Sequence, residues 1–294
     1  VQNAASLLDE GQWLIGDGWN DNQFVDGQIP TKEELDAVTK RPIFLNRVCH
    51  HVALVNTAAF QLAGITNETP DPEGGKIGRY KNGELNGLLY EQAMNLVSST
   101  FQQEGESYIV SLEHYLQLAI EHMQSYGLTG GHTEEMAYFG QYTNPLTAYQ
   151  RVVGGKKHFR VNLLRHHTVF EEMVINNASF DEPFIEPGAM KIFADGSFGG
   201  STAAVLEPYA NEADNKGMLI HTDEQLEALI QLARKYGEAV AIHIIGDGSM
   251  EQVLPYLEKY PVAKGKRDRL IHCCLVSEEQ LNRIKKLSVI LDLQ

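Results

Sequence analysis

The sequence predicts an α/β protein, a TIM-type (β/α)8 barrel that is truncated to about six strands and preceded by an inserted substructure. Helix and strand patterns alternate over residues 101–294, which is typical of a parallel sheet. The strand at residues 239–245 is apolar at both parities, as expected of a strand buried on both faces. A doubly wound open sheet shows the same alternation, so strand counting leaves both architectures open.

Six barrel strands are expected, and the helices between them have recognisable ends. Thr222 with Gln225 and Ser277 with Gln280 are capping boxes, and Gly237 stands where a left-handed helix terminus is expected. A closed barrel needs eight strands and about 250 residues, so residues 101–294 are predicted to be strands two to seven. The strands are expected to end near His132, Leu164, Ala194, Ile245, Cys273 and Leu293.

The first hundred residues have a different character. Residues 1–12 are predicted to be a helix remnant that follows a missing first strand, because a helical pattern begins at residues 4–8. Gly, Pro, Asn and Asp cluster at residues 16–22 and 69–87, so residues 13–100 are predicted to be a subdomain inserted over the barrel mouth. Both ends of the chain look cut from a longer protein.

Composition argues against several partners. The 294 residues carry 24 basic and 39 acidic side chains, a net charge of −15, which disfavours nucleic acid and anionic membranes as partners. No apolar run approaches the roughly 20 residues that span a bilayer. Cys49 stands alone and Cys273 adjoins Cys274, so reduced thiols and a cytoplasmic location are expected.

Three polar residues end or interrupt apolar strands, where barrel enzymes place their function. These are Lys191, His243 and His272. The histidines are 272 − 243 = 29 residues apart, close to one βα repeat of roughly 30, so they are expected at equivalent heights on adjacent strands. Neighbouring imidazoles at one height are typical of a divalent-metal site, whereas two core histidines bonded to carbonyl groups are the alternative.

Lys191 lies inside the apolar run 189–194, where an unpaired ammonium group costs free energy or loses its proton. Three explanations stay open. The amine could form an ion pair with Asp195 or another acid, serve as a neutral amine in Schiff-base chemistry, or be converted into a metal ligand. The glycine-rich loop that follows at residues 195–201 is suited to approach a ligand.

The sequence resembles the metal-dependent amidohydrolases of amidohydrolase family 3, the YtcJ-like branch. The matching stretches occur in the same order along almost the whole chain. They are residues 18–20, 47–56, 69–75, 86–90, 127–129, 190–197, 241–247 and 269–272.

The resemblance implies a (β/α)8 barrel with His243 and His272 as metal ligands on strands five and six. Lys191 takes the strand-four position, where such enzymes can carry a carboxylated lysine that bridges two metals. The implied cofactor is one or two divalent ions, with zinc expected. The implied activity is hydrolysis of amide or other non-peptide C–N bonds in small molecules, with proton transfer by an aspartate on strand eight.

Four further residues are predicted to contact the small-molecule substrate. The resemblance places His51 and Asn56 in the inserted part that covers the site, and Trp19 along the pocket. Asp195 begins the glycine-rich loop after Lys191. Residues of the insertion could equally serve only to hold it together.

The sequence also departs from the family pattern. The family's His-x-His on strand one has no counterpart, because His50–His51 and His166–His167 are adjacent pairs whose side chains would point to opposite faces of an extended strand. The strand-eight aspartate is absent from the chain. This polypeptide is therefore expected to bind metal partially or not at all and to have little hydrolase activity, although the parent protein should have both.

Two other functions stay open, a Schiff-base lyase that uses Lys191 and a non-catalytic barrel that binds small molecules. A six-stranded barrel would also expose unpaired backbone groups at the strands near His132 and Leu293. We therefore expect a homo-oligomer or strand exchange through these edges.

Overall fold

The structure is a computed structural model that describes residues 1–6, 12–25, 27–101, 105–155, 157–180 and 182–293. The chain divides into two compact units. Unit 1 comprises residues 1–101 together with 195–221, and unit 2 comprises residues 102–194 together with 222–294. Segment 195–221, which the sequence placed in the barrel core, therefore belongs to the N-terminal unit.

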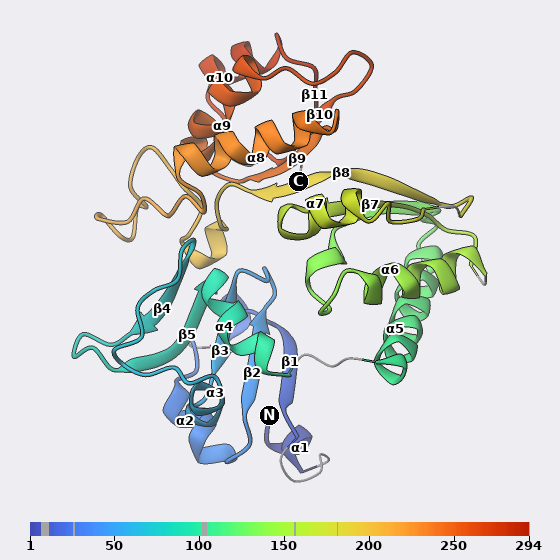
Figure 1. Ribbon diagram of the computed structural model, residues 1–294. Coiled ribbons are helices and arrows are strands. Elements are labelled where there is room, and N and C mark those ends of the chain that lie inside the picture. The colour runs from blue at the N-terminus through green and yellow to red at the C-terminus, as the bar shows by residue number, and fades with distance from the viewer. Residues whose placement is uncertain (7–11, 26, 102–104, 156, 181, 294) are drawn as a thin grey trace. The chain divides into compact units, whose positions relative to one another are not determined.

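Unit 2 contains a six-stranded parallel sheet in the order β11-β10-β9-β8-β7-β6 (Figure 1). Its strands are β6 (Gly130–Thr133), β7 (Arg160–His166), β8 (Ile185–Phe193), β9 (Val240–Ile244), β10 (Asp268–His272) and β11 (Val289–Leu293). Each strand ends within two residues of the predicted position. The parallel α/β architecture is thereby confirmed.

The sheet of unit 2 curls like half of a barrel. The strands β6 and β11 are at opposite edges of the strand order. Nevertheless the charges of Arg269 on β10 and Asp292 on β11 act on the His132 side chain of β6. A curled sheet brings the inner faces of its two edges toward each other, as in barrels.

Helices cover the outer face of this sheet. Helix α8 (Asp223–Lys235), α9 (Asp247–Lys259) and α10 (Glu278–Ile284) pack on strands β8–β11 through an apolar core (Figure 1). Both predicted capping boxes are present, and Gly237 has φ +70° after α8. The other end of the sheet is covered by elements around Phe159 and Leu163. These are α5 (Glu106–Ser125), η4 (Glu135–Ala137), α6 (Thr143–Tyr149), the π-helix η5 (Gln150–Gly154) and α7 (His167–Ile175).

Unit 1 is built on a five-stranded mixed sheet in the order β1-β2-β3-β5-β4. Its strands are β1 (Leu14–Trp19), β2 (Ile43–Arg47), β3 (Val52–Val55), β4 (Gly75–Arg79) and β5 (Leu85–Glu91). Among the strand pairs that the structure describes in unit 1, β1 and β2 run parallel and the others are antiparallel. The short helical elements are α1 (Gln2–Ala5), η1 (Asp21–Gln23), α2 (Lys32–Val38), α3 (Thr57–Leu62), η2 (Gln92–Met94), α4 (Asn95–Ser98), η3 (Ser99–Phe101) and η6 (Phe198–Gly200).

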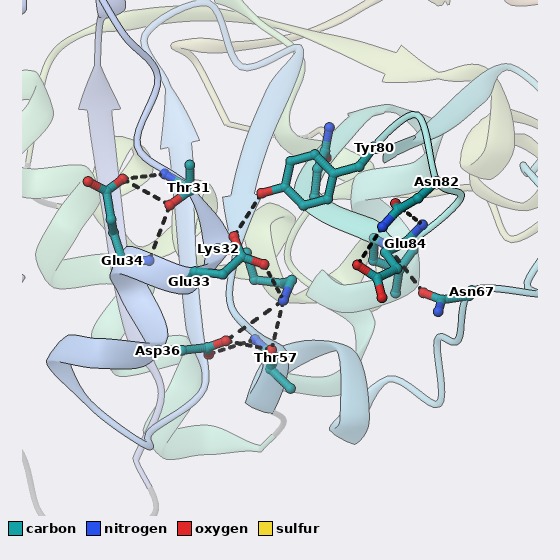
Figure 2. A network of polar contacts seen from close by, with 12 residues as sticks. Thr31, Lys32, Glu33, Glu34, Asp36, Thr57, Asn67, Tyr80, Asn82 and Glu84 are labelled. Carbon is teal, nitrogen blue, oxygen red and sulfur yellow. Dashed lines mark hydrogen bonds and ion pairs between the residues drawn. The ribbon is translucent and has the colours of Figure 1, made fainter.

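A polar network joins α2 to its neighbours in unit 1 (Figure 2). The Lys32 ammonium lies 2.9 Å from Glu33 and 3.3 Å from the Thr57 hydroxyl at the start of α3. The Tyr80 hydroxyl, next to β4, donates to Glu33 at 2.7 Å. The network therefore links α2, α3 and the β4–β5 hairpin.

The N-terminal helix remnant is described only in part. Helix α1 covers Gln2–Ala5, and the remainder of the predicted pattern at residues 7 and 8 lies outside the described residues. In the part of the chain that the structure describes, no helix has both the length and the apolar character needed to cross a membrane.

Candidate functional site

The carboxyl ends of four neighbouring strands in unit 2 carry the candidate site. His166 ends β7, Lys191 lies near the end of β8, His243 lies in β9, and His272 ends β10. His166 pairs with Lys191 and Lys191 pairs with Ala241 in the parallel register. Residues paired in register point to the same face of a sheet, so His166, Lys191 and His243 share one face.

The imidazoles of His243 and His272 lie side by side. Their ring centroids are 4.7 Å apart and the rings are inclined at 77°. The strands are adjacent as predicted, but the heights differ by one residue, because His243 pairs with Ile271 and His272 pairs with Ile244. A regular strand would turn His272 to the other face. Its backbone instead has φ +75°, which departs from strand geometry where the rings meet.

The Lys191 side chain is buried in unit 2, with 4% of its surface exposed. Its Nζ lies 3.8 Å from the centroid of the Phe193 ring. Burial lowers the pKa of the amine to about 8, while the carboxylate of Glu134 acts in the opposite direction. The lowered pKa raises the fraction of the amine that is neutral, and the neutral form is the nucleophile.

Phe193 connects the histidines with the lysine. Its ring centroid lies 5.1 Å from that of His243 and 6.0 Å from that of His166, in addition to its contact with Lys191. The apolar ring removes water from around these groups. The low dielectric strengthens each electrostatic interaction in the site.

The prediction for His166–His167 was wrong in its geometry. The two rings stack, with centroids 4.4 Å apart and planes inclined at 33°. The chain leaves the strand at this point, because His166 is the N-cap of α7 and its Nδ1 accepts a bond from Thr168 N at 3.3 Å. Opposite orientation holds only for neighbours in an extended strand.

The donor chemistry of unit 2 fits a divalent ion in part. His243 and His272 supply two imidazoles, which are suitable zinc ligands. Lys191 can contribute only after conversion, because an ammonium group has no lone pair. Among the residues that the structure describes, no group of three or more His, Cys, Asp or Glu side chains is arranged to hold a metal.

The four predicted substrate contacts lie in unit 1. Trp19 lines a cavity of about 540 Å³. Asn56 is completely buried; its amide accepts from Ile43 N and Ala59 N and donates to the Arg41 carbonyl, contacts that hold the backbone together. Asp195 is also completely buried and accepts from Ala204 N at 3.0 Å.

His51 belongs to a buried polar chain in unit 1. Its Nδ1 lies 2.6 Å from Oε2 of Glu91, and the other oxygen of Glu91 accepts from the Thr202 hydroxyl at 2.7 Å. Glu91 has φ +49° and ψ −126°, a conformation that costs free energy in an L residue. The carboxylate thus fixes the orientation of the His51 ring.

Sequence reasoning missed Phe193, Glu134 and Glu91. Phe193 lies two residues after Lys191 in the same strand, and this spacing alone could have placed it on the lysine's face. Neither Glu134 nor Glu91 carries a local sequence signal for its contacts. Their partners are distant in the sequence.

The chain is similar to known proteins over its whole length. A family model described as the amidohydrolase family matches residues 1–294. YtcJ of Bacillus subtilis (strain 168), which carries the name of an amidohydrolase, is 42% identical over 289 residues, covering 98% of this chain and 54% of that protein. The N-substituted formamide deformylase of Arthrobacter pascens is 28% identical over 272 residues, covering 88% of this chain and 48% of that protein.

A solved structure has a similar fold. The crystal structure of an uncharacterised metal-dependent hydrolase from Pyrococcus horikoshii OT3 aligns with a TM-score of 0.66 and 25% identity, covering 97% of this chain and 55% of that one. The chain spans about half the length of the relatives it matches. Its strand-end histidines, its curled parallel sheet and the match over all 294 residues lead to one assignment: the chain belongs to the amidohydrolase family.

Proposed function

We propose that this chain supplies part of a metal-dependent hydrolase that cleaves amide or other non-peptide C–N bonds in small molecules. The observation that carries the proposal is the His243–His272 pair, with rings 4.7 Å apart at the ends of adjacent parallel strands. The family assignment supports hydrolysis, and one relative is named after an N-substituted formamide, a compound with an amide C–N bond.

The roles of the residues follow from their chemistry. His243 and His272 would hold a divalent ion, with zinc as the metal we propose, through neutral imidazole nitrogens. The ion, when bound, lowers the pKa of a water molecule and polarises the substrate carbonyl. Lys191 would react as a neutral amine with carbon dioxide, forming an N–C bond and releasing one proton, to give an anionic oxygen ligand for one ion or a bridge between two.

Two imidazoles and one modifiable amine are fewer ligands than a closed zinc site has. We therefore propose that this polypeptide alone holds the ion weakly and is a poor catalyst. The whole protein would complete a (β/α)8 barrel and add the remaining ligands. Cys49, Cys273 and Cys274 are not joined in disulfides, which supports our proposal of a cytoplasmic protein.

Zinc titration of the dialysed chain tests the metal site. We expect calorimetry to detect zinc binding by the native chain, and His243→Ala or His272→Ala to weaken it at least tenfold. His114→Ala, on helix α5, is the matched control and should bind as the native chain does. Equal affinity in all four proteins would overturn the proposed site.

A second function is favoured by the lowered pKa of Lys191, which burial brings to about 8. A neutral amine attacks a carbonyl carbon, and loss of water then gives a Schiff base. Borohydride in the presence of pyruvate would trap this adduct on Lys191, as peptide mass spectrometry would show. Absence of an adduct in the native chain, with zinc binding intact, would exclude the Schiff-base reaction with pyruvate.

We propose a second copy of the chain as a partner, in addition to the small-molecule substrate. In the described six-stranded sheet, β6 and β11 are edge strands, and such edges pair readily with another chain. Light scattering should therefore report a mass that rises with concentration. A constant monomer mass would remove this proposal.

A further inference from the structure

A row of side chains crosses the whole sheet of unit 1 and lines one cavity. Trp19 on β1 pairs with Arg47 on β2, and Val52 on β3 pairs with Tyr90 on β5, which pairs with Lys76 on β4. Extending the β2–β3 register by one residue places Arg47 opposite Val52. All five residues line the cavity of about 540 Å³.

Segment 195–221 supplies the remaining part of the lining. Glycines allow it to lie close to the row: a Cβ on Gly199 would be 2.4 Å from Nη1 of Arg47, and one on Gly200 would be 3.0 Å from Val52. Gly217, with φ +71°, could not carry a side chain either, because its Cβ would meet the Ala203 carbonyl. The cavity is therefore formed by unit 1 alone, from two stretches distant in the sequence.

The charges in the lining cancel. Arg47 and Lys76 are the described lining cations, and Asp21 and Glu212 are the described lining acids. Arg47 is satisfied by Asp21, whose Oδ1 accepts from Nε at 2.7 Å. Glu212 accepts from Asn215. Burial, and then the charge of Glu212, raise the pKa of Tyr90, which pairs with Lys76. An anion would face two carboxylates and a cation would face two basic groups, so a neutral ligand is favoured.

The polar groups offer both kinds of hydrogen bond. Lys76 and Asn22 can donate, whereas Asp21 and Glu212 can accept. The Asn215 amide instead donates to the Ser201 carbonyl and to Glu212, and so holds the wall of the cavity in place. Small-molecule pockets of roughly 300–1,000 Å³ are usually lined mostly by apolar side chains. This one has more polar than apolar side chains, with Trp19, Tyr90 and Phe198 as its aromatic members. A hydroxyl group both donates and accepts, and the faces of aromatic rings pack against C–H groups.

We propose that this cavity of unit 1 is a binding site for an uncharged polyhydroxylated small molecule, such as a mono- or disaccharide. The aromatic side chains would pack on the C–H surface of the ligand, and the carboxylates, amides and Lys76 would bind its hydroxyl groups. The site includes Trp19, one of the four predicted substrate contacts, but none of the unit 2 residues assigned to metal binding. It therefore goes beyond the proposed hydrolysis and can be tested without a metal.

The two tryptophans give a direct measurement. Trp13 packs against Phe101 in the core of unit 1, whereas Trp19 lines the cavity. In a Trp13→Phe variant, the fluorescence would report Trp19 alone. Titration in EDTA with maltose, D-glucose and N-acetyl-D-glucosamine should give a saturable change for at least one sugar, and benzoate and benzylamine should give none. Saturation-transfer NMR on the native chain provides the same comparison without the substitution.

Variants identify the binding residues. Glu212→Gln and Lys76→Met should each weaken sugar binding about tenfold, as expected when a hydrogen bond to a charged group is lost. Lys81→Met and Glu207→Gln, outside the lining, are the matched controls and should bind as the native chain does. No sugar binding by either method, tighter binding of benzoate or benzylamine, or equal affinity in all variants would overturn the proposal.

Discussion

The register partner of His243 is Ile271, yet its ring lies 4.7 Å from that of His272. The backbone of His272 has φ +75°, in the left-handed region, at the residue whose ring makes this contact. His272 therefore has two separate properties, an imidazole that can bind metal and a backbone with positive φ. Substitutions at this residue can test the two properties one at a time.

We predict that His272→Asn and His272→Ala both lose zinc affinity at least tenfold. Asparagine tolerates positive φ far better than alanine does, so only the alanine variant should lose stability, by about 1 kcal/mol. Calorimetric zinc titration and urea unfolding followed by circular dichroism measure the two effects. Native zinc affinity in the asparagine variant would exclude His272 as a ligand.

Lys191 should make stability depend on pH. Below about pH 8 the amine is protonated in both states, and its burial is a constant cost. Between about pH 8 and 10.5 the unfolded chain binds more protons than the folded chain, so stability rises with pH. Lys191→Met should therefore stabilise unit 2 at pH 7 by about 3 kcal/mol and flatten this rise.

The measurement requires a probe of unit 2. Both tryptophans lie in unit 1, so urea unfolding at pH 7 and pH 10 should be followed by far-ultraviolet circular dichroism. Lys264→Met, at an exposed position before β10, is the control and should leave the pH dependence unchanged. A Lys191→Met variant with native pH dependence would contradict the lowered pKa.

The ion pair between Arg234 and Asp268 should be strongly coupled. The Asp268 carboxylate is buried, lies 2.7 Å from Nη2 of Arg234 and accepts from Val240 N at 2.9 Å. Asp268→Asn leaves the Arg234 charge without its counter-ion, which should cost about 3 kcal/mol of unfolding free energy.

A double-mutant cycle with Arg234→Met tests this coupling. We expect a coupling energy of about 1–3 kcal/mol for the buried pair. The matched cycle on the exposed pair Arg151–Glu106, 2.6 Å apart, should give below about 1 kcal/mol. Equal coupling energies in the two cycles would show that burial does not strengthen the ion pair between Arg234 and Asp268.

Gly196 should tolerate no side chain. A Cβ there would come within 2.2 Å of Glu91 Oε1 and would also meet the Thr202 hydroxyl, displacing the groups that orient His51. Gly196→Ala is expected to destabilise unit 1 by about 1–3 kcal/mol. Tryptophan fluorescence during urea unfolding follows this unit. Gly131→Ala, which meets nothing within 4 Å, is the control and should have near-native stability by circular dichroism.

Much of unit 2 could be predicted because its signals are local. The capping boxes at Thr222 and Ser277 and the left-handed Gly237 depend on residues within one helical turn. The strands, buried on both faces, form uninterrupted apolar runs that locate their ends within two residues. Lys191 was found because a charged residue interrupted such a run.

Unit 1 could not be predicted in the same way. In its sheet, β3 pairs with β5 rather than with β4, the next strand along the chain. This pairing depends on contacts between residues that are distant in the sequence. The assignment of segment 195–221 to unit 1 is equally non-local. At the site, the ring contact between His166 and His167 depends on β7 ending at His166 and α7 beginning at His167, a boundary that the sequence pattern does not locate to one residue.

The division of the chain has a consequence for dissection of the protein. The polypeptide passes from one unit to the other after Phe101, after Ala194 and after His221. A single cut at any of these points leaves at least one unit incomplete, and a product ending at Phe101 would lack half the walls of its own cavity. Independent expression of unit 1 therefore requires a circular permutant or the co-production of two peptides. For the same reason, a single recombination between two genes could not replace one unit and leave the other intact.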